Sequence, residues 1–566
     1  MQDEIQQRVD RIRRSRSELE NHVIDEFFAG HISRREFVRA GSVVGFSLPL
    51  LSFIAACGTG GSTGTGTQSS TGNVKKGGKI TVGLVSPAHA VDPFKVGDEG
   101  GLVVLFQMGE YLAFSDANLK LQPRLAESWS PNQDGSVWTF KIRQGVTFND
   151  AAGTPMTAED VAATINMHAD PANGSNALSV FKGVVTKGAA KATDPSTVQV
   201  TLDAPNGNFP YLLSSDNYNL IILPKTYNGG FDQPGPKSFV GTGPWKVTSF
   251  RTGAGMSTVR NPTYWDKSNT PPLDAVDWTF IADEQPRILA LQGNSVQVVN
   301  HFSASGGQAI FNDQNINVID VKAAAHRQVH MRTDMEPFTD KRVRQAVALS
   351  LSRPDLVQGL LNGKAQIAND SPFFKLYPST DPSVAQRSQA LDKARQLLSA
   401  AGKSSFAVTL TTWRGFEIPD YAQLIQSSVK KIGGTITLNI TDDSTYYGDA
   451  VFGKSPWLDS VMGITDYGHR GVPNVYLGAP LLSTGTWNSA HFKNPEYDGL
   501  VKQYLAALDL QAQKKLSGKI EQLLVDETPI IFAYNYDTLA GVRSNIANVE
   551  ITGYGQVNLT KAGFKA

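Results

Sequence analysis

The sequence has 566 residues, and its 52 lysines and arginines are balanced by 52 aspartates and glutamates. Proteins that bind nucleic acid through phosphate contacts need a basic field, so this neutral balance argues against that class. The length exceeds the size at which one hydrophobic core stops growing, which predicts two or three domains. Cys57 is the only cysteine, so a disulfide within the chain is excluded.

The first predicted element is an export signal over residues 1–56. Arg34 and Arg35 precede a moderately apolar segment at 40–56, which ends in small residues directly before Cys57. The stretch S-R-R-E-F-V-R, followed by I-A-A-C, resembles a twin-arginine signal joined to the lipobox of bacterial lipoproteins. This resemblance implies export of the folded protein and a lipid on Cys57. The alternative is a buried helix or a membrane span, but glycines and a proline interrupt the segment, and a span needs about 20 strongly apolar residues.

A flexible tether is predicted at 57–74, because 58–72 consists almost entirely of Gly, Ser and Thr. A coil of this length would hold the folded body about 20 Å from the membrane. Downstream of the tether, no apolar run is long enough to span a bilayer. We therefore expect the body at the outer face of the cytoplasmic membrane, extracellular or periplasmic, held by the lipid alone.

The body is predicted to open with a strand at 79–85. A second strand, at 136–143, alternates apolar and polar residues and should bury one face. A helix is predicted to begin after Thr157, which can cap it, and Glu159 and Asp160 lie at the favourable end of the helix dipole.

The second half alternates helical and strand patterns. A helix follows Asp340, its predicted N-cap, and another amphipathic helix covers 391–401. Strands at 406–411 and 435–440 flank a helix at 420–432. Strands that alternate with helices predict an α/β layered fold.

Five motifs then appear in order along about 450 residues. They are L-Q-P-R-L-A-E-S-W with D-G-S-V-W-T-F-K-I-R, V-G-T-G-P-W-K-V-T-S-F with R-N-P-T-Y-W-D, P-F-T-D-K-R-V-R-Q-A-V, N-S-A-H-F-K-N-P-E-Y-D, and D-E-T-P-I-I-F-A-Y-N. Together they resemble the family-5 solute-binding proteins of ABC importers, which include oligopeptide, dipeptide and nickel binders.

The resemblance implies a type-II periplasmic-binding-protein fold, with two α/β lobes that close like a hinge and an extra family-specific domain. Lobe I would combine 75–111, 240–325 and 536–566. The extra domain would be 112–239, and lobe II 326–535. The implied function is capture of peptides or peptide-like solutes between the lobes and delivery to ABC permease subunits. We expect a monomer that needs no cofactor.

The implied ligand anchor is Asp466, within Gly463-Ile-Thr-Asp-Tyr467. This segment resembles the family motif W-x-A-D-Y, whose aspartate pairs with the α-ammonium of a peptide. A carboxylate enclosed in a cleft needs a cation partner, which fits that role; a surface or turn aspartate is the alternative. The sequence departs from the motif in lacking its tryptophan and alanine, and Gly468–Gly471 replaces the usual acidic-Pro. Arg470 in that loop could meet a carboxylate or phosphate, or be a solvated loop arginine.

Four further residues are candidates for the cleft. Trp413 follows a strand end, where ligand clefts of α/β domains commonly lie. Trp457 and Trp487 are candidate cleft aromatics, although each of the three tryptophans fits a hydrophobic core as well. Glu99 ends a turn that resembles the segment lining the family cleft beside the hinge.

Two patterns imitate other functions. Gly448–Ser455 has the spacing of a phosphate-binding loop, but a proline follows it. The family resemblance implies instead a short helix at 446–452 that stops at Gly453. His326 and His330 have zinc-ligand spacing only on a helix, whereas 321–332 is typical of a strand. An exported hydrolase remains an alternative, as does a binder of a nickel chelate, haem or a sugar conjugate.

Overall fold

The computed structural model describes residues 70–235 and 238–566. These residues belong to one unit, Thr65–Ala566. The predictions on Arg34, Arg35 and Cys57 lie outside the described residues. Within the described ranges, none of the helices combines the length and the apolar character that a bilayer span requires.

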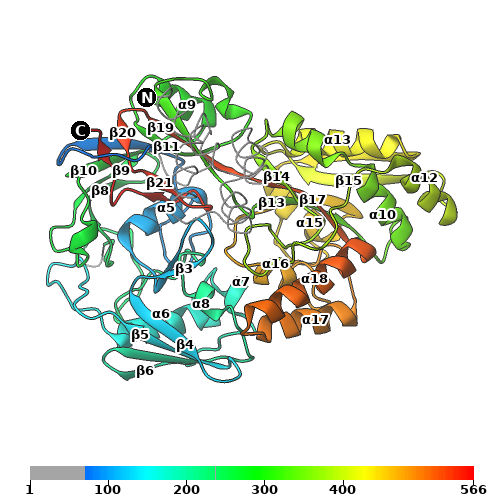
Figure 1. Cartoon of the computed structure of the whole chain (residues 1–566). Helices are drawn as coiled ribbons and strands as arrows, with labels where there is room; N and C mark the ends of the chain where they lie inside the picture. The colour runs from blue at the N-terminus through cyan, green and yellow to red at the C-terminus, as the bar shows by residue number, and fades with distance from the viewer. Residues whose placement is uncertain (1–69, 236–237) are drawn as a thin grey trace, which may run out of the picture. The chain divides into compact units, whose positions relative to one another are not determined.

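The first large sheet of the described chain has seven strands around a parallel centre. In spatial order these are β12 (Ile316–Val321), β19 (Thr538–Arg543), β11 (Val298–Phe302), β1 (Lys79–Leu84), β10 (Ala275–Phe280), β9 (Gly255–Arg260) and β8 (Trp245–Arg251). β1 runs parallel to β10 and β11, and the outer strands pair antiparallel. Helices α5 (Glu99–Met108) and α9 (Glu284–Gln292) accompany this sheet, which forms lobe I (Figure 1).

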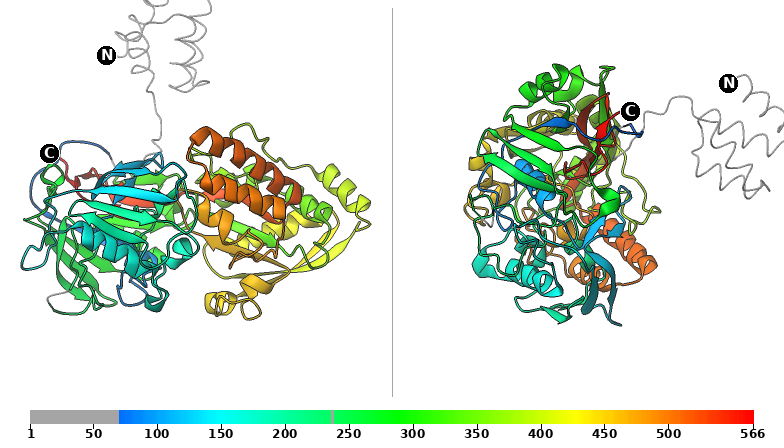
Figure 2. Two further views of the ribbon diagram at one scale, coloured as in Figure 1. Left: turned by 90° about the horizontal axis from the view of Figure 1, so that it is seen from below. Right: turned by 90° about the vertical axis from the view of Figure 1, so that its left-hand side faces the viewer.

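The second sheet, of six strands in the described chain, forms lobe II. Its order is β14 (Ala365–Ile367), β18 (Ile530–Tyr536), β13 (His326–Met331), β17 (Met462–Tyr467), β15 (Phe406–Trp413) and β16 (Gly434–Thr441). Its strands β13, β17 and β18 are buried on both faces: Ile531 of β18 joins the core of the helices α10 (Lys341–Ser350), α12 (Leu391–Ala400) and α13 (Ile418–Lys430). Phe532 packs instead with α17 (Pro495–Ala506) and α18 (Leu510–Glu527), which lie side by side in Figure 2.

A four-stranded antiparallel sheet lies between β3 and β8 in the sequence. Its order is β4 (Ala126–Pro131), β5 (Val137–Ile142), β7 (Thr197–Thr201) and β6 (Ala190–Asp194). The alternation predicted for β5 is confirmed, because Trp138, Phe140 and Ile142 are buried. The start of α6 (Ala158–Ala169) is also confirmed: the Asp160 carboxylate accepts hydrogen bonds from the backbone N–H and the hydroxyl of Thr157 at 2.8 and 2.9 Å.

Shorter elements complete the described chain. They are α7 (Leu178–Phe181), α8 (Phe209–Leu212), α11 (Arg353–Asp355), α14 (Asp443–Tyr447), α15 (Pro456–Asp459) and α16 (Asn474–Gly478), with the strand pairs β2 (Ala113–Ser115) and β3 (Leu121–Pro123), β20 (Ile546–Ala547) and β23 (Gly563–Phe564), and β21 (Glu550–Ile551) and β22 (Val557–Asn558).

Two segments cross between the large sheets and make the hinge. In the first, β12 leads into β13 through residues 322–325. In the second, which is red in Figure 1, β18 leads into β19 through Asp537 alone. The type-II binding-protein fold, with two α/β lobes, is thereby confirmed. The continuous strand predicted at 321–332 was wrong in its first part, because the chain leaves one sheet at Val321 and enters the other at His326.

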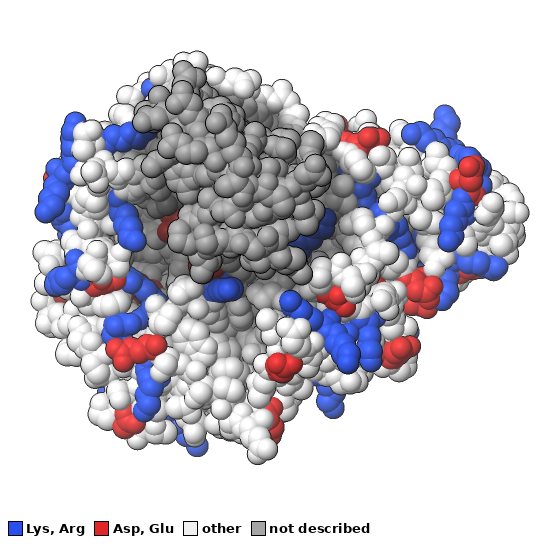
Figure 3. Space-filling model, viewed as in Figure 1, with Lys and Arg blue, Asp and Glu red and all other residues white. Residues whose placement is uncertain are grey.

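The helix predicted at 446–452 was also wrong. α14 covers Asp443–Tyr447 and ends at Gly448, whose φ of 52° lies in the left-handed region. Asp442 caps this helix by accepting the Thr445 N–H at 2.8 Å. Because the capping residue is Asp442, the helix starts and stops earlier than expected. On the surface, positive and negative side chains are interspersed over the described part of the face in Figure 3.

Candidate functional site between the two lobes

The lobe II sheet brings charged side chains to the hinge because several strands begin or end there. β13 starts with His326 and Arg327 directly after the crossing segment, and β17 ends with Asp466 and Tyr467. The two strands pair antiparallel, with Arg327 opposite Asp466 in the register. Tyr536, the last residue of β18, completes this edge.

Arg327 is the centre of the resulting cluster. Its Nε and Nη2 donate to the two carboxylate oxygens of Glu417 at 3.0 and 3.2 Å, and its Nη1 donates to Oδ1 of Asp466. The side chain is only 3% exposed. Paired and multiply hydrogen-bonded guanidinium groups are the form in which a buried arginine is tolerated.

Aromatic side chains enclose the same guanidinium. Its centre lies 4.1 Å from the ring of Tyr536 and 5.0 Å from that of Phe416, distances at which a cation is attracted to a ring face. The Tyr536 hydroxyl donates to Oδ1 of Asp466 at 2.9 Å. Burial opposes the charge on Arg327, but Asp466 and Glu417 outweigh it and keep its pKa above the usual range.

The cluster retains one negative charge, because a single guanidinium meets two carboxylates. The Asp466 side chain is 25% exposed, and its Oδ2 accepts no hydrogen bond from a described residue. This oxygen can therefore receive a further cationic donor.

Lobe I contributes His301 to the interlobe cavity, and Glu99 is the partner of this histidine. Glu99, the first residue of α5, accepts a hydrogen bond from Asn300 at 2.8 Å and lies 3.1 Å from Nδ1 of His301 on β11. Burial would raise the pKa of Glu99, but His301 and Asn300 lower it; burial would lower the pKa of His301, but Glu99 raises it. The pair is thus held as an ion pair.

A cavity of about 40 Å³ lies between the lobes beside Arg327, and neither Asp466 nor Glu99 is among its lining residues. It is lined by residues of both lobes, among them His301, Ser303, Arg327, Glu417 and Tyr536. This volume holds a few water molecules at most. The lobes therefore stand close together in this structure, and a solute would need them to separate before it could enter.

The three predicted tryptophans pack in one aromatic cluster. The rings of Trp413 and Trp457 both contact Tyr447, with ring centres 5.9 and 5.7 Å from it. The Asp466 backbone N–H donates to the Tyr447 hydroxyl at 3.4 Å, so this group borders the charged cluster. Trp487 packs against the same cluster and also on Tyr467, at 6.3 Å between ring centres.

Arg470 is separated from the Asp466 cluster. Its Nη1 donates to the hydroxyl of Tyr554 at 3.3 Å, and its carbonyl accepts from Tyr377 at 2.7 Å. The side chain is half-buried, so it is not the fully solvated loop arginine that was the alternative. The structure does not bring Arg470 and Asp466 into one site.

Comparison with known proteins agrees with this architecture. Residues 120–467 match the family described as "Bacterial extracellular solute-binding proteins, family 5 Middle". The chain belongs to this family.

Relatives of this solute-binding protein include the dipeptide-binding protein DppE of Bacillus subtilis (strain 168), 27% identical over 74% of this chain and 79% of DppE. The glutathione-binding protein GsiB of Escherichia coli (strain K12) is 25% identical over 80% of this chain and 88% of GsiB. Among solved structures, the periplasmic binding protein DppA of Helicobacter pylori in complex with the peptide STSA gives a TM-score of 0.70 at 21% identity, covering 87% and 99% of the two chains. Members of the family bind solutes for ABC transporters outside the cytoplasm.

Sequence reasoning missed Arg327, Glu417, Tyr536 and His301. The one available signal was an arginine in a run of small, apolar and neutral polar residues, directly after His326 in β13. Its partner Asp466 lies 139 positions further along the chain. Only the pairing of β13 with β17 shows that the two side chains meet.

The two imitating patterns form other structures. His326 and His330 are buried on strand β13 and bond to the carbonyls of Ala324 and Ser460, each at 3.0 Å. Among the described residues, no group of three or more His, Cys, Asp or Glu side chains is arranged to hold a metal ion. In the 448–455 stretch, the helix that follows is the four-residue α15, which begins at a proline. That is not the helix of a phosphate-binding loop.

Proposed function

We propose that this family-5 solute-binding protein captures a peptide or peptide-like solute between its lobes and presents it to an ABC permease. It binds its solute without converting it. Export through the twin-arginine signal and a lipid on Cys57 would tether it to the outer face of the membrane. Asp466 would receive the α-ammonium group of the solute.

The observation that carries this proposal is the residual negative charge at Asp466. Arg327 compensates one carboxylate of the pair Glu417 and Asp466, and the free Oδ2 of Asp466 remains accessible. A carboxylate partly shielded from water favours a cation at that oxygen. The neighbouring aromatic group around Tyr447 adds rings that can contact an ammonium or an apolar side chain.

Melting temperature in the presence of ligands tests the proposal. We would compare short free-amine peptides, glutathione, the same peptides N-acetylated, a nickel–histidine chelate, haem and a sugar conjugate. A ligand at one hundred times its dissociation constant, binding only the folded state, stabilises it by about 2.7 kcal/mol. We expect a shift with free-amine peptides, a much smaller one with N-acetylated peptides, and loss of the shift in Asp466→Asn.

Asp420→Asn is the matched control, because Asp420 is exposed on α13 and its loss changes the net charge equally. It should keep the wild-type response. A shift with the chelate, haem or the sugar conjugate and none with peptides would reject the peptide assignment. Turnover of a peptide in the same samples would instead support a hydrolase.

A further inference from the structure

A second, larger cavity lies outside the interlobe cleft. Its volume is about 400 Å³, within the range of small-molecule sites. Its lining residues fall in 106–124, 244–269 and 548–561, and none comes from 326–535, which holds the lobe II sheet. Lobe closure is therefore not needed to form it. No role in solute transfer between the lobes accounts for this cavity.

Two carboxylates in its wall lack an ion-pair partner among the described residues. Glu550 on β21 accepts one hydrogen bond, from the Asn558 amide at 2.9 Å, and is half-buried. Asp116 accepts from the Asn118 and Lys120 backbone N–H groups and from the Gln122 amide. A third lining carboxylate differs from them, because Arg124 pairs with Glu110 and with Asp266.

Charge at the cavity is negative near these two groups. Burial raises the pKa of Glu550; Asn558 and Lys561 oppose this rise, and Asp116 adds to it. Lys561 is exposed and forms no ion pair with a described residue, so it only partly offsets the two carboxylates. A cation that enters the cavity would relieve their uncompensated charge.

Part of the remaining wall is aromatic. Phe106 and Phe114 lie with ring centres 6.2 Å apart, and Tyr264 and Trp245 also line the cavity. Aromatic faces beside carboxylates are the surroundings that bind organic cations.

We propose that this cavity binds a small organic cation, an ammonium group on an apolar body. The ammonium would lie at Glu550 and Asp116, and the apolar body against Phe106 and Phe114. This site goes beyond the proposed capture of a solute between the lobes. It would operate whether the lobes are open or closed.

Titration calorimetry of the full chain with phenethylamine tests the site. We expect wild type to bind it, and Glu550→Gln to bind at least tenfold more weakly. The glutamine keeps an oxygen that accepts from Asn558, so the local fold is retained. Lys561→Met removes a positive charge that repels the ammonium, so this variant should bind phenethylamine several-fold more tightly than wild type. The neutral isostere 2-phenylethanol should not distinguish the three proteins.

The interlobe site supplies the control, because Asp466→Asn should bind phenethylamine as wild type does while losing the response to peptides. Conversely, Glu550→Gln should keep the response to peptides. No binding by wild type, or equal affinity in wild type and Glu550→Gln, would overturn the cavity site. Loss of amine binding in Asp466→Asn alone would place the amine in the cleft and equally overturn it.

Discussion

Glu99 at the start of α5 and His301 on β11 form an ion pair in which each charge favours the other. The raised pKa of His301 means that its share of the stability is complete below its unfolded value of 6.5 and is lost as the pH rises through the raised value. The lowered pKa of Glu99 means that its share is present above 4.5 and is lost as the pH falls through the lowered value. The ion pair therefore stabilises the folded state most between pH 4.5 and pH 6.5.

Replacement of Glu99 by Gln should remove this pH dependence. We expect the free energy of unfolding of wild type to fall, relative to the variant, between pH 5.5 and pH 8.5, because only in wild type does Glu99 make the folded state hold the His301 proton more tightly than the unfolded state does. A difference of one pH unit between the folded and unfolded pKa corresponds to about 1.4 kcal/mol. Urea unfolding at the two pH values measures it. The exposed His89→Gln should keep the wild-type dependence; an unchanged profile in Glu99→Gln would show that the pair is not ionised.

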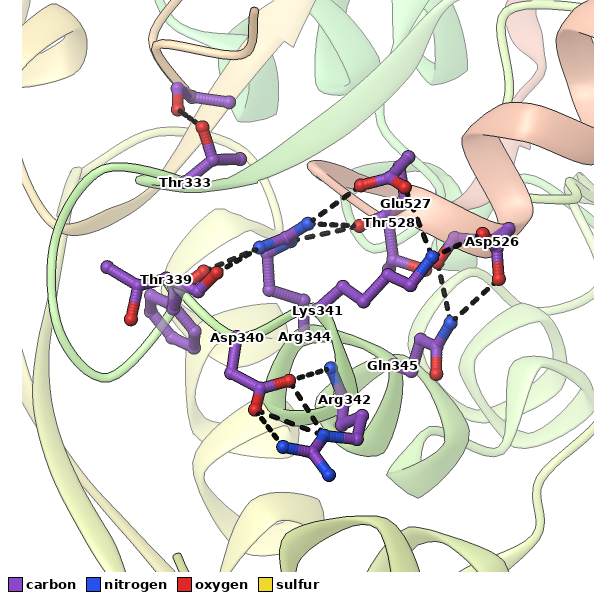
Figure 4. A network of polar contacts seen from close by, with 12 residues as sticks. Thr333, Thr339, Asp340, Lys341, Arg342, Arg344, Gln345, Asp526, Glu527 and Thr528 are labelled. Atoms are coloured by element: carbon purple, nitrogen blue, oxygen red, sulfur yellow. Dashed lines mark hydrogen bonds and ion pairs between the residues drawn. The ribbon is translucent and has the colours of Figure 1, made fainter. Parts of the chain in front are cut away.

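At the scale of elements, Arg344 joins α10 to the end of α18 (Figure 4). Its Nε and Nη2 donate to the carbonyl of Glu527 at 2.9 and 2.6 Å, and its Nη1 donates to that of Phe338 at 2.6 Å. The side chain is 4% exposed. These bonds satisfy a carbonyl at the end of α18 that has no partner within the helix.

Replacing Arg344 by Met should therefore cost about 2–4 kcal/mol, because charged hydrogen bonds are lost and buried carbonyls remain unpaired. Urea denaturation measures the cost. Arg342→Met is the matched control: its side chain is 43% exposed and pairs with Asp340, which still caps α10 through the backbone N–H of residue 342. Equal midpoints for the two variants would contradict this role for Arg344.

Elements set by neighbouring residues could be predicted from the sequence, and contacts between distant strands could not. The alternation of β5 and the caps of α6 and α10 depend on residues a few positions apart, and all three are as expected. The break between β12 and β13 lies inside one β-rich run, because each half pairs with a different sheet. The meeting of Arg327 and Asp466 likewise depends on strand register, so the sequence predicted Asp466 as a candidate anchor without its internal partner Arg327.

At the scale of the whole folded unit, a further contact besides the hinge joins the segment at Asn206–Asn208 to lobe II. The Gly207 backbone N–H donates to the carbonyl of Leu505 at 2.7 Å, and the Asn208 amide donates to Asn474 at 3.0 Å. Leu505 belongs to α17, so this contact must be broken or shifted when lobe II rotates away. The small volume of the interlobe cavity and this contact both indicate that the lobes are closed in this structure.

Gly207→Ala should shift the unit toward an open arrangement, because a Cβ at this position would lie 2.2 Å from the carbonyl oxygen of Ala507. We expect a larger radius of gyration by small-angle X-ray scattering, and a several-fold weaker apparent affinity for solute, since fewer molecules occupy the closed, binding-competent state. Gly499→Ala on α17 is the control: its added Cβ meets nothing within 4 Å, and alanine stabilises a helix by up to about 1 kcal/mol over glycine. Equal radii and affinities in both variants would show that closure does not depend on this contact.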